Sequence, residues 1–445
     1  MKRFILFMLT VSITLLAGCK KVLDTQSELY IDQSLSIVDK RSAQAALVGA
    51  YNALSQNTYQ GNTFRYITNL LGDNIKWVGN TPTNREFDVY GVFTTNTRVQ
   101  ELWTAIYKTV NIANNIIDNV PAVNDVTFDQ TQRNTERGEA FFLRALSYFD
   151  LVRLWRNVPI VTQATKTASD NKDITNSTGE EVYQFIENDL DSAEVLLPAT
   201  VNRNRANVYT AKALKARLYL YQENWKKAED YATQIINDSI DFKLTKPYSQ
   251  FYAAKNSTES IFEVDYTINN KNSYASNWFQ NPTSGGRKEF LPTDDFIALL
   301  KDPNIGGSRS ALIFTVSGVT YGNMNFKIAT GEDQSYVLRL AEMYLIRAEA
   351  KAEQFKLADG LTDLNVIRNR ANVPSIAAVS AKEELVDKIL LERRVELAYE
   401  SHRWFDLIRK GKAQQVLGIS DVNKLLLPIP KQEVLIAGLT QNKGY

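Results

Sequence analysis

Apolar residues recur every three or four positions along most of the chain, which is the spacing of one face of an α-helix. Segment 99–119 is one example, with Leu102, Ile106 and Val110 in register. Segment 139–155 is apolar almost all round, which predicts a central, buried helix. The other segments with helical spacing are 42–54, 180–197, 211–221, 225–236, 336–353, 357–371 and 382–409. This pattern predicts a mostly α-helical protein.

Two of these segments, 211–221 and 225–236, are separated only by Gln222, Glu223 and Asn224. Both carry small alanines between large aromatic residues, and small side chains let two helices approach closely. The pair resembles a tetratricopeptide helix hairpin. A second hairpin is predicted from 336–353 and 357–371, although no regular 34-residue period runs along the chain.

Two stretches, 72–96 and 241–334, break the helical pattern. They are rich in Asn, Thr, Ser and Gly and contain short β-like runs such as 260–266 and 313–316. In a helical scaffold, long ordered loops often carry the functional site. We therefore expect the ligand site in these stretches.

The N-terminus has the pattern of a lipoprotein leader. Basic residues 2–3 precede an apolar run over 4–16, which is too short to span a bilayer. Leu16, Ala17 and Gly18 then lead to Cys19, the only cysteine of the chain. We expect residues 1–18 to be a signal peptide and 19–38 a tether that is lipidated at Cys19 and anchored in a membrane. The alternative is an ordinary cleaved signal with an incidental cysteine.

Charge and residue usage exclude several classes of function. The chain has 51 basic and 50 acidic residues, and loss of Lys2 and Arg3 with the leader leaves 49 against 50. A nucleic-acid partner is not expected, since phosphate binding needs a basic surface. The sequence shows no phosphate-binding glycine loop, metal-ligand cluster or nucleophile elbow. It therefore offers no positive case for an enzyme and predicts no cofactor.

The single histidine, His402, argues against zinc hydrolysis and against Ser/His or Cys/His catalysis. It shares a helical register with Leu391, Val395, Ala398 and Phe405. This places it on an apolar stripe, and we expect a buried core histidine.

Trp77 and Trp278 lie in the two irregular stretches, beside short polar side chains. A sugar ring has an apolar face that packs on an aromatic plane and a rim of hydroxyls that bind Asp, Asn, Arg or Gln. The two tryptophans therefore suggest carbohydrate recognition. Composition supports equally the alternative that they pin their loops to the scaffold.

Four parts of the chain carry motifs of a known family. They are 144–153 with Trp155, Val158 and Pro159; 339–349 with Leu364, Asn365, Ile367, Arg368 and Arg370; 389–412; and Pro428, Ile429, Pro430 and Glu433 with 441–445. The most specific is 389–412, which contains Glu392, Arg393, Arg394, Glu396, Glu400, Arg403, Trp404, Phe405 and Asp406. On these motifs the chain resembles the SusD/RagB family of outer-membrane nutrient-binding lipoproteins.

The resemblance implies one SusD-like body over residues 39–445, built mostly of tetratricopeptide-like helix pairs with long irregular loops and minor β-structure. Its parts would be an N-terminal part at about 39–240, a loop-rich ligand region at about 241–335 and a C-terminal SusD/RagB part at about 336–445. The motif residues are expected to be scaffold, and no binding role is transferred to them.

The resemblance also implies a function. Members of the family capture oligosaccharide at the cell surface, without cleaving it, and deliver it to a SusC-like TonB-dependent outer-membrane transporter. Ligand contact is expected at Trp77 and Trp278, with Asp73, Asn74, Tyr274 and Arg287 as polar or flanking partners. The lipid would hold the body at the outer membrane, facing the exterior. The alternatives are a peptide- or protein-binding lipoprotein serving the same kind of transporter, and an enzyme.

Overall fold

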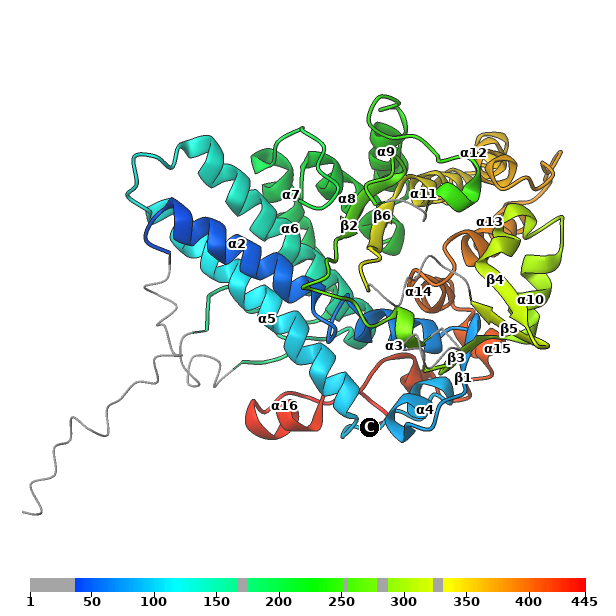
Figure 1. Cartoon of the computed structure of the whole chain (residues 1–445), viewed down its shortest axis with the longest axis horizontal. Coiled ribbons are helices and arrows are strands. Elements are labelled where there is room, and N and C mark those ends of the chain that lie inside the picture. Colours follow the sequence, from blue (N-terminus) through cyan, green and yellow to red (C-terminus); the bar gives the residue numbers. More distant parts are fainter. Residues whose placement is uncertain (1–36, 166–173, 252–254, 278–286, 323–330) are drawn as a thin grey trace, which may run out of the picture.

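The computed structural model describes residues 37–165, 174–251, 255–277, 287–322 and 331–445. These ranges form a mostly helical body with three short two-stranded sheets (Figure 1). The expected signal peptide, Cys19 and Trp278 lie outside the described residues. No helix within the described ranges is both long and apolar enough to span a bilayer.

The N-terminal part consists of long helices that pack side by side (Figure 1). Helix α5 (Thr97–Asn119) packs on both α2 (Lys40–Ser55) and α6 (Gln130–Trp155), and α6 also packs on α7 (Gly179–Leu196). The predicted central helix is confirmed, because the side chains of α6 are almost continuously buried from Gly138 to its end.

Side-chain caps fix where several of these helices begin. At α7 the Thr178 hydroxyl accepts a hydrogen bond from the Glu181 amide at 3.2 Å, and the Glu181 carboxylate accepts one from the Thr178 amide at 2.7 Å. Such a capping box satisfies backbone donors that would otherwise have no partner in the helix. Asn207 caps α8 (Val208–Tyr221) in the same way.

The two predicted helix hairpins are present. Helix α8 pairs with α9 (Trp225–Ile236), and α11 (Leu340–Glu353) pairs with α12 (Leu357–Arg370). Helix α9 packs on α11, so the two hairpins stack, and α13 (Lys382–Glu396) continues the layer. The alanines at these contacts are fully buried, which allows close approach of the helix axes; they are Ala213, Ala216, Ala228, Ala232, Ala341 and Ala348.

The prediction of one helix over 382–409 is wrong. The structure breaks it into α13 and α14 (Arg403–Arg409). In the connecting segment Tyr399 and Ser401 adopt positive φ angles of 64° and 66°, which a helix does not allow. His402 ends this segment and is buried, as predicted. Burial and the charges of nearby arginines, Arg217 first, hold the pKa of His402 well below its usual value, so the ring is neutral.

Three antiparallel strand pairs order the irregular stretches, and one of them includes the strand that directly precedes α11. Strand β1 (Ile75–Trp77) pairs with β3 (Phe290–Pro292), β2 (Ser260–Val264) with β6 (Ser335–Arg339), and β4 (Ile313–Val316) with β5 (Val319–Gly322). The two β-like runs predicted from sequence correspond to β2 and β4. The same stretches also contain the short helices α4 (Pro82–Asp88) and α10 (Asp294–Lys301).

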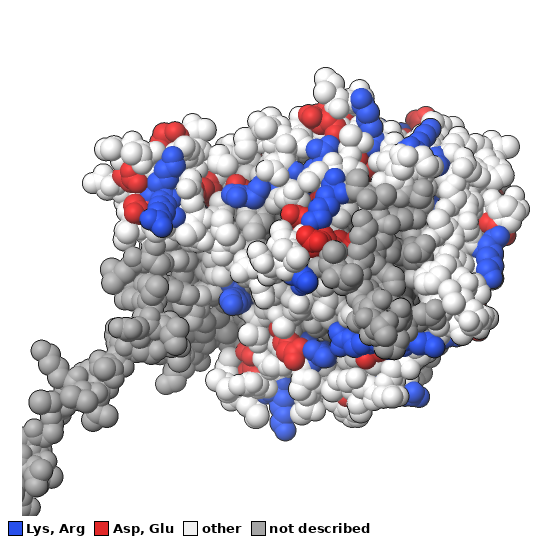
Figure 2. Space-filling model, viewed as in Figure 1, with Lys and Arg blue, Asp and Glu red and all other residues white. Residues whose placement is uncertain are grey.

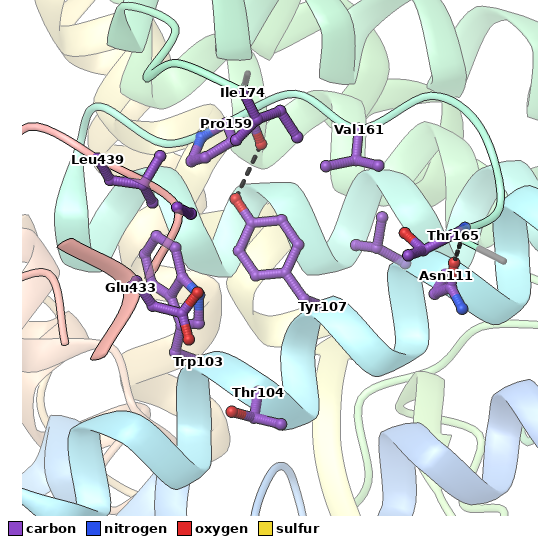
Figure 3. A pocket seen from close by; sticks show the side chains of 12 residues that line it. Trp103, Thr104, Tyr107, Asn111, Pro159, Val161, Thr165, Ile174, Glu433 and Leu439 are labelled. Atoms are coloured by element: carbon purple, nitrogen blue, oxygen red, sulfur yellow. Dashed lines mark hydrogen bonds between the residues drawn. The ribbon is translucent and has the colours of Figure 1, made fainter. Parts of the chain in front are cut away.

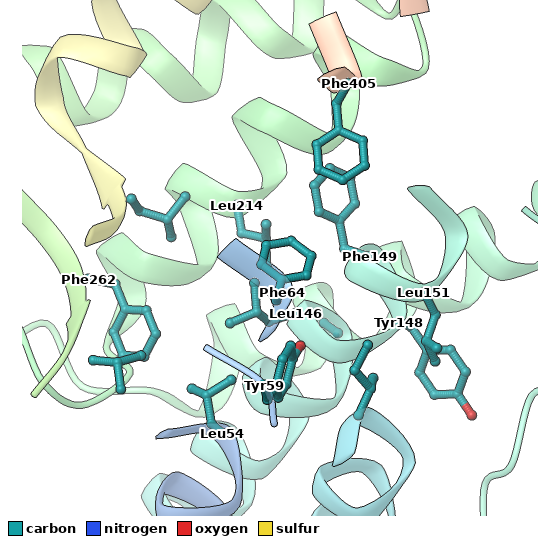
Figure 4. Packing of buried hydrophobic residues seen from close by; sticks show 14 of the residues in the cluster. Leu54, Tyr59, Phe64, Leu146, Tyr148, Phe149, Leu151, Leu214, Phe262 and Phe405 are labelled. Atoms are coloured by element: carbon teal, nitrogen blue, oxygen red, sulfur yellow. The ribbon is translucent and has the colours of Figure 1, made fainter. Parts of the chain in front are cut away.

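One hydrophobic core joins the N-terminal helices to the C-terminal part. In its centre Phe64 of α3 (Thr63–Leu70) stacks on Phe405 of α14 with ring centroids 6.3 Å apart (Figure 4). The buried Arg153 guanidinium lies 4.1 Å from the Phe405 ring and 4.3 Å from the Phe149 ring. Arg153 is also paired with Asp150 inside the core.

A buried network of charged residues joins the family motifs. Arg339 donates to Glu259, Glu396 and Glu400, each at 2.8 Å. Arg309 lies 3.2 Å from Oε2 of Glu396, whereas Arg339 binds its Oε1. The Glu400 carboxylate thus pairs with Arg339. The remaining helices are α15 (Ala413–Leu417) and α16 (Lys431–Ile436).

Candidate ligand-binding site

Trp77, the first predicted ligand contact, lies on β1 and is only 7% exposed. Its indole meets the ring of Phe290 on β3 edge-to-face, with centroids 5.7 Å apart. Its backbone amide donates to the Asp88 carboxylate at 3.1 Å. The side chain therefore packs its loop onto the body and presents no open face on which a sugar could stack.

Asp73 and Asn74, the predicted polar partners, bind arginines of the C-terminal motif. Arg403 donates to both oxygens of Asp73, at 2.6 and 2.9 Å, and Arg394 Nε donates to Asn74 Oδ1 at 2.9 Å. Burial raises the pKa of the Asp73 carboxyl, but hydrogen bonds and charge from Arg403 outweigh it and hold that pKa below its usual value. Both side chains thus link the first irregular stretch to α13 and α14.

Tyr274 is fully buried. The Arg65 guanidinium covers its ring at 4.1 Å, and its hydroxyl accepts a hydrogen bond from Asn69 Nδ2 at 3.0 Å. Arg287 is different, because it is exposed and donates to the Ser276 hydroxyl at 3.0 Å.

The structure thus brings Asp73, Asn74, Trp77 and Tyr274 together around the β1–β3 pair, with Asp73 half-buried and the other three buried. Asp73 and Asn74 bind arginines, Trp77 packs on Phe290 and Tyr274 is covered by Arg65. Contact of these four residues with a ligand stays a prediction. Contact by the exposed Arg287, and by Trp278 outside the described residues, stays a prediction.

A pocket of about 220 Å³ lies along α5, away from these residues (Figure 3). Its floor is one face of α5, since the α5 residues that line it follow the helical spacing i, i+1, i+4, i+7 and i+8. A second wall comes from the chain after α6 and before α7, and a third from α16 and the residue Leu439. The twelve lining residues are Trp103, Thr104, Tyr107, Val110, Asn111, Pro159, Val161, Thr165, Ile174, Glu433, Ala437 and Leu439.

Two aromatic rings form the centre of this pocket. Trp103 and Tyr107 lie with centroids 4.9 Å apart, and the indole of Trp103 is braced edge-to-face by Trp155 at 5.1 Å. The Tyr107 hydroxyl points away from α5 and donates to the Pro159 carbonyl at 2.8 Å (Figure 3). Burial raises the pKa of this hydroxyl well above its usual value, so it stays protonated as a donor. Both rings are therefore held in place before any ligand arrives.

Polar groups border the rings. Glu433 Oε1 accepts a hydrogen bond from Gln100 Nε2 at 3.0 Å, and the same amide contacts the Thr104 hydroxyl at 3.2 Å. At the other end Asn111 Oδ1 accepts from the Thr165 amide at 2.6 Å. An aromatic surface with carboxylate, hydroxyl and amide groups around it matches the two-sided chemistry of a sugar ring.

The third wall of the pocket is clamped to the core. Trp155 Nε1 donates to the Pro428 carbonyl at 2.8 Å, and the Gln441 side chain bonds both backbone groups of Ile429 at 2.7 Å. Asn442 Nδ2 donates to the Trp155 carbonyl at 3.0 Å. The segment that carries Glu433 and Leu439 is thus held in place at both of its ends.

Two other surface pockets of the described residues fit a sugar less well. One of about 280 Å³ lies between α2 and β2, but its Tyr51 hydroxyl donates to Glu139 and Arg205 covers the tyrosine ring at 4.9 Å. The other, of about 230 Å³ beside α13 to α15, has no aromatic lining residue. The pocket along α5 is therefore the candidate site.

Sequence reasoning did not identify this site. Most of the Trp103 side chain packs in the core, since it is only 3% exposed. The signal was an aromatic pair at i and i+4 on α5 with Thr104 and Asn111 beside it. The opposing walls come from segments distant in sequence, so the pattern on α5 alone could not show a pocket.

Two family models match consecutive parts of the chain. Residues 22–220 match a family described as starch-binding associating with outer membrane, and residues 221–424 match the SusD family, SusD_RagB. The chain belongs to the SusD family. Within it, the chain is similar to SusD-like protein P38 of Formosa agariphila, with 25% identity over 94% of each protein. It is 27% identical to the starch-binding protein SusD of Bacteroides thetaiotaomicron, over 71% of this chain and 75% of that protein.

Solved structures of SusD proteins have the same fold. A laminarin-binding SusD-like protein superposes with a TM-score of 0.79 at 25% identity, covering 92% of this chain and 100% of that one. The resemblance stated from the motifs and the mostly helical SusD fold expected from it are thus both confirmed.

Proposed function

We propose that this SusD protein is a non-catalytic oligosaccharide-binding lipoprotein of the outer membrane that delivers its ligand to a SusC-like TonB-dependent transporter. Family membership supports the proposal, since one matching family is described as starch-binding associating with outer membrane and one relative as laminarin-binding. The leader ending at Cys19 supports a lipid anchor, and placement at the cell exterior with a transporter partner follows from the family resemblance.

The observation that carries sugar binding is the pocket along α5. Tyr107 provides a rigid aromatic surface that is braced by the buried Trp103, and Glu433 and Thr104 provide oxygen atoms beside it. Rings that are fixed in advance lose little conformational entropy when a ligand stacks on them. We propose that one ring of the oligosaccharide stacks on Tyr107 while its hydroxyls bind the polar border. Arg287 and Trp278 are proposed as further contacts of a longer chain.

This proposal predicts that Tyr107→Ala weakens oligosaccharide binding roughly 2- to 12-fold, because an aromatic ring contact contributes about 0.5–1.5 kcal/mol. Tyr107→Phe keeps the aromatic face and should bind nearly as wild type. Titration calorimetry would compare malto- and laminari-oligosaccharides on the chain from Lys20 onward. Trp278→Ala in the same series tests the predicted loop contact.

The matched control is Phe355→Ala, an aromatic residue that is 74% exposed between α11 and α12. Its affinity for the same sugars should be unchanged. Thermal melts of each variant separate loss of binding from loss of folding. Equal affinity of wild type and Tyr107→Ala would rule out the pocket as the sugar site.

Peptide binding is the second candidate function, and the lining of the pocket is the observation that favours it. Eight of the twelve lining residues are apolar, so an apolar side chain of a peptide would also be accommodated. Retention of peptides on the immobilised protein, without any response to oligosaccharides, would support this alternative.

A further inference from the structure

Glu433 is the only charged residue among the twelve that line the pocket along α5, and none of them is basic. Within the described part of the chain, no lysine or arginine forms an ion pair with this carboxylate. Among the described residues, the charge of Glu433 therefore faces the pocket without a countercharge. A ligand that contacts the twelve described lining residues meets one negative group and no positive one.

The position of Glu433 is well determined. It lies in the first turn of α16, where the Lys431 amide donates to the Thr94 carbonyl at 2.9 Å and holds the helix against the start of α5. Gln100 Nε2 binds one carboxylate oxygen at 3.0 Å. Glu433 and Trp103 both line the pocket (Figure 3).

The field of this carboxylate extends to the aromatic ring on which a ligand would stack. The pKa of the Tyr107 hydroxyl is raised first by burial, then by Tyr148, and also by the negative charge of Glu433. Because the two side chains share one lining, a sugar ring on Tyr107 would lie in the same field.

Such a field treats neutral and acidic sugars differently. A sugar hydroxyl can donate a charge-assisted hydrogen bond to a carboxylate. A second carboxylate or a sulfate about 6 Å away would be repelled, and at an effective dielectric constant of about 20 this lowers the affinity by about 100-fold.

The volume of the pocket limits how much ligand it can hold. Its roughly 220 Å³ is below the range of roughly 300–1,000 Å³ typical of sites that enclose drug-sized ligands. The pocket therefore suits one sugar ring, with the rest of an oligosaccharide running outside it.

We infer that the pocket along α5 binds one uncharged pyranose ring and rejects uronic and sulfated sugars, with Glu433 as the residue that determines this specificity. The inference rests on the proposed function, because it describes which sugars that site accepts.

The test uses pairs of oligosaccharides that differ in one charge. Maltohexaose, laminarihexaose and cellohexaose would each be compared with the same sugar oxidised at C6 to a carboxylate. Titration calorimetry at low salt is expected to show about 100-fold tighter binding of the neutral member by wild type. Glu433→Gln should reduce that ratio to less than about fivefold, mainly by improving binding of the oxidised sugar.

Two variants serve as controls. Glu433→Asp keeps the negative charge and should keep the preference for the neutral sugar over its oxidised form. Asp118→Asn removes an exposed carboxylate at the far end of α5 and should leave the ratio unchanged. If Glu433→Gln does not fold, the wild type still gives a test. Raising NaCl from 0.05 to 0.5 M should lower the ratio of the affinity for the neutral sugar to the affinity for its oxidised form, because salt screens charge repulsion.

The outcomes separate the inference from the function. Binding of no neutral oligosaccharide by wild type would overturn the proposed function and the inference together. Tight binding of a neutral sugar and equal or tighter binding of its oxidised form would overturn the inference and leave the function standing. An unchanged ratio in Glu433→Gln would remove Glu433 as the determinant.

Discussion

Glu396 shows how single buried charges hold this body together. It is fully buried and contacts Arg339 at 2.8 Å, Arg309 at 3.2 Å and also Arg370. Burial raises the pKa of its carboxyl, but the charges of these arginines outweigh it and hold that pKa below its usual value. The carboxylate is therefore ionised, and it neutralises cations that are themselves out of contact with water.

Replacing Glu396 by Gln is expected to lower the free energy of unfolding by about 3–5 kcal/mol, because it leaves buried arginines without their countercharge. Urea denaturation measures the change. The matched control is Glu384→Gln on the same helix, where the carboxylate lies 3.5 Å from Lys388 at the surface. That change should cost less than about 1 kcal/mol. Equal effects of the two substitutions would contradict this account of the network.

Glu136 on α6 predicts a dependence of stability on pH. Burial and the negative charge of Glu139 raise its pKa from 4.5 to about 7, and one of its oxygens has no hydrogen-bond partner among the described residues. Because the pKa is higher in the folded state, the folded form favours the protonated acid. Its contribution to stability is present below about pH 4.5 and is lost as the pH rises through about 7.

Glu136→Gln, which resembles the protonated form, should therefore remove part of the stability loss between pH 5 and pH 8. The difference in free energy of unfolding between variant and wild type is expected to grow by about 1 kcal/mol over this range. Urea denaturation at both pH values measures it, and Glu384→Gln should show a difference that does not change with pH. If the free energy of unfolding of Glu136→Gln differs from that of wild type by the same amount at both pH values, the raised pKa of Glu136 is refuted.

The sequence predicted single residues well where local spacing was enough. His402 was expected in the core and lies there. Trp77 and Tyr274 were expected at a ligand surface and are buried, because the polarity of their neighbours in sequence does not reveal which distant side chains cover them. Phe290 and Arg65 provide that cover.

At the scale of helices and strands, the periodicity of apolar residues predicted which helices exist better than it predicted where they begin and end. The helices from 99 to 236 and the two hairpins follow from apolar spacing and short connections. The break after Glu396 does not follow from spacing, because 391–405 keeps a helical register of apolar residues. The structure breaks there because Glu400 turns toward Arg339 and Tyr399 packs on Phe296, at a ring distance of 5.7 Å. Both partners lie far away in sequence.

At the scale of the whole molecule, contacts between distant segments decide the site. Strand β1 pairs with β3 more than 200 residues later, and no local pattern indicates that register. The pocket along α5 likewise needs walls from three parts of the chain. Figure 2 shows acidic and basic side chains interspersed over one face of the body, in agreement with the near balance of charge in the sequence.

The proposed anchor gives a prediction for the intact protein. Cys19→Ala should abolish attachment to the membrane fraction, because the lipid is the proposed link to the outer membrane. Oligosaccharide affinity, measured on the solubilised protein, should be unchanged, whereas uptake of the sugar by cells should be lost. Fractionation and transport assays measure these effects. Membrane attachment of the variant at the wild-type level would refute lipidation at Cys19 as the anchor.

The hydrogen bond from Gln100 to Glu433 joins residues that are 333 positions apart. This contact closes a long stretch of chain, so the C-terminal segment must dock on α5 before the pocket has its third wall. A molecule with that segment undocked carries the tyrosine of α5 but lacks the carboxylate beside it. If the pocket is the sugar site, as proposed, such a molecule would not hold sugar there.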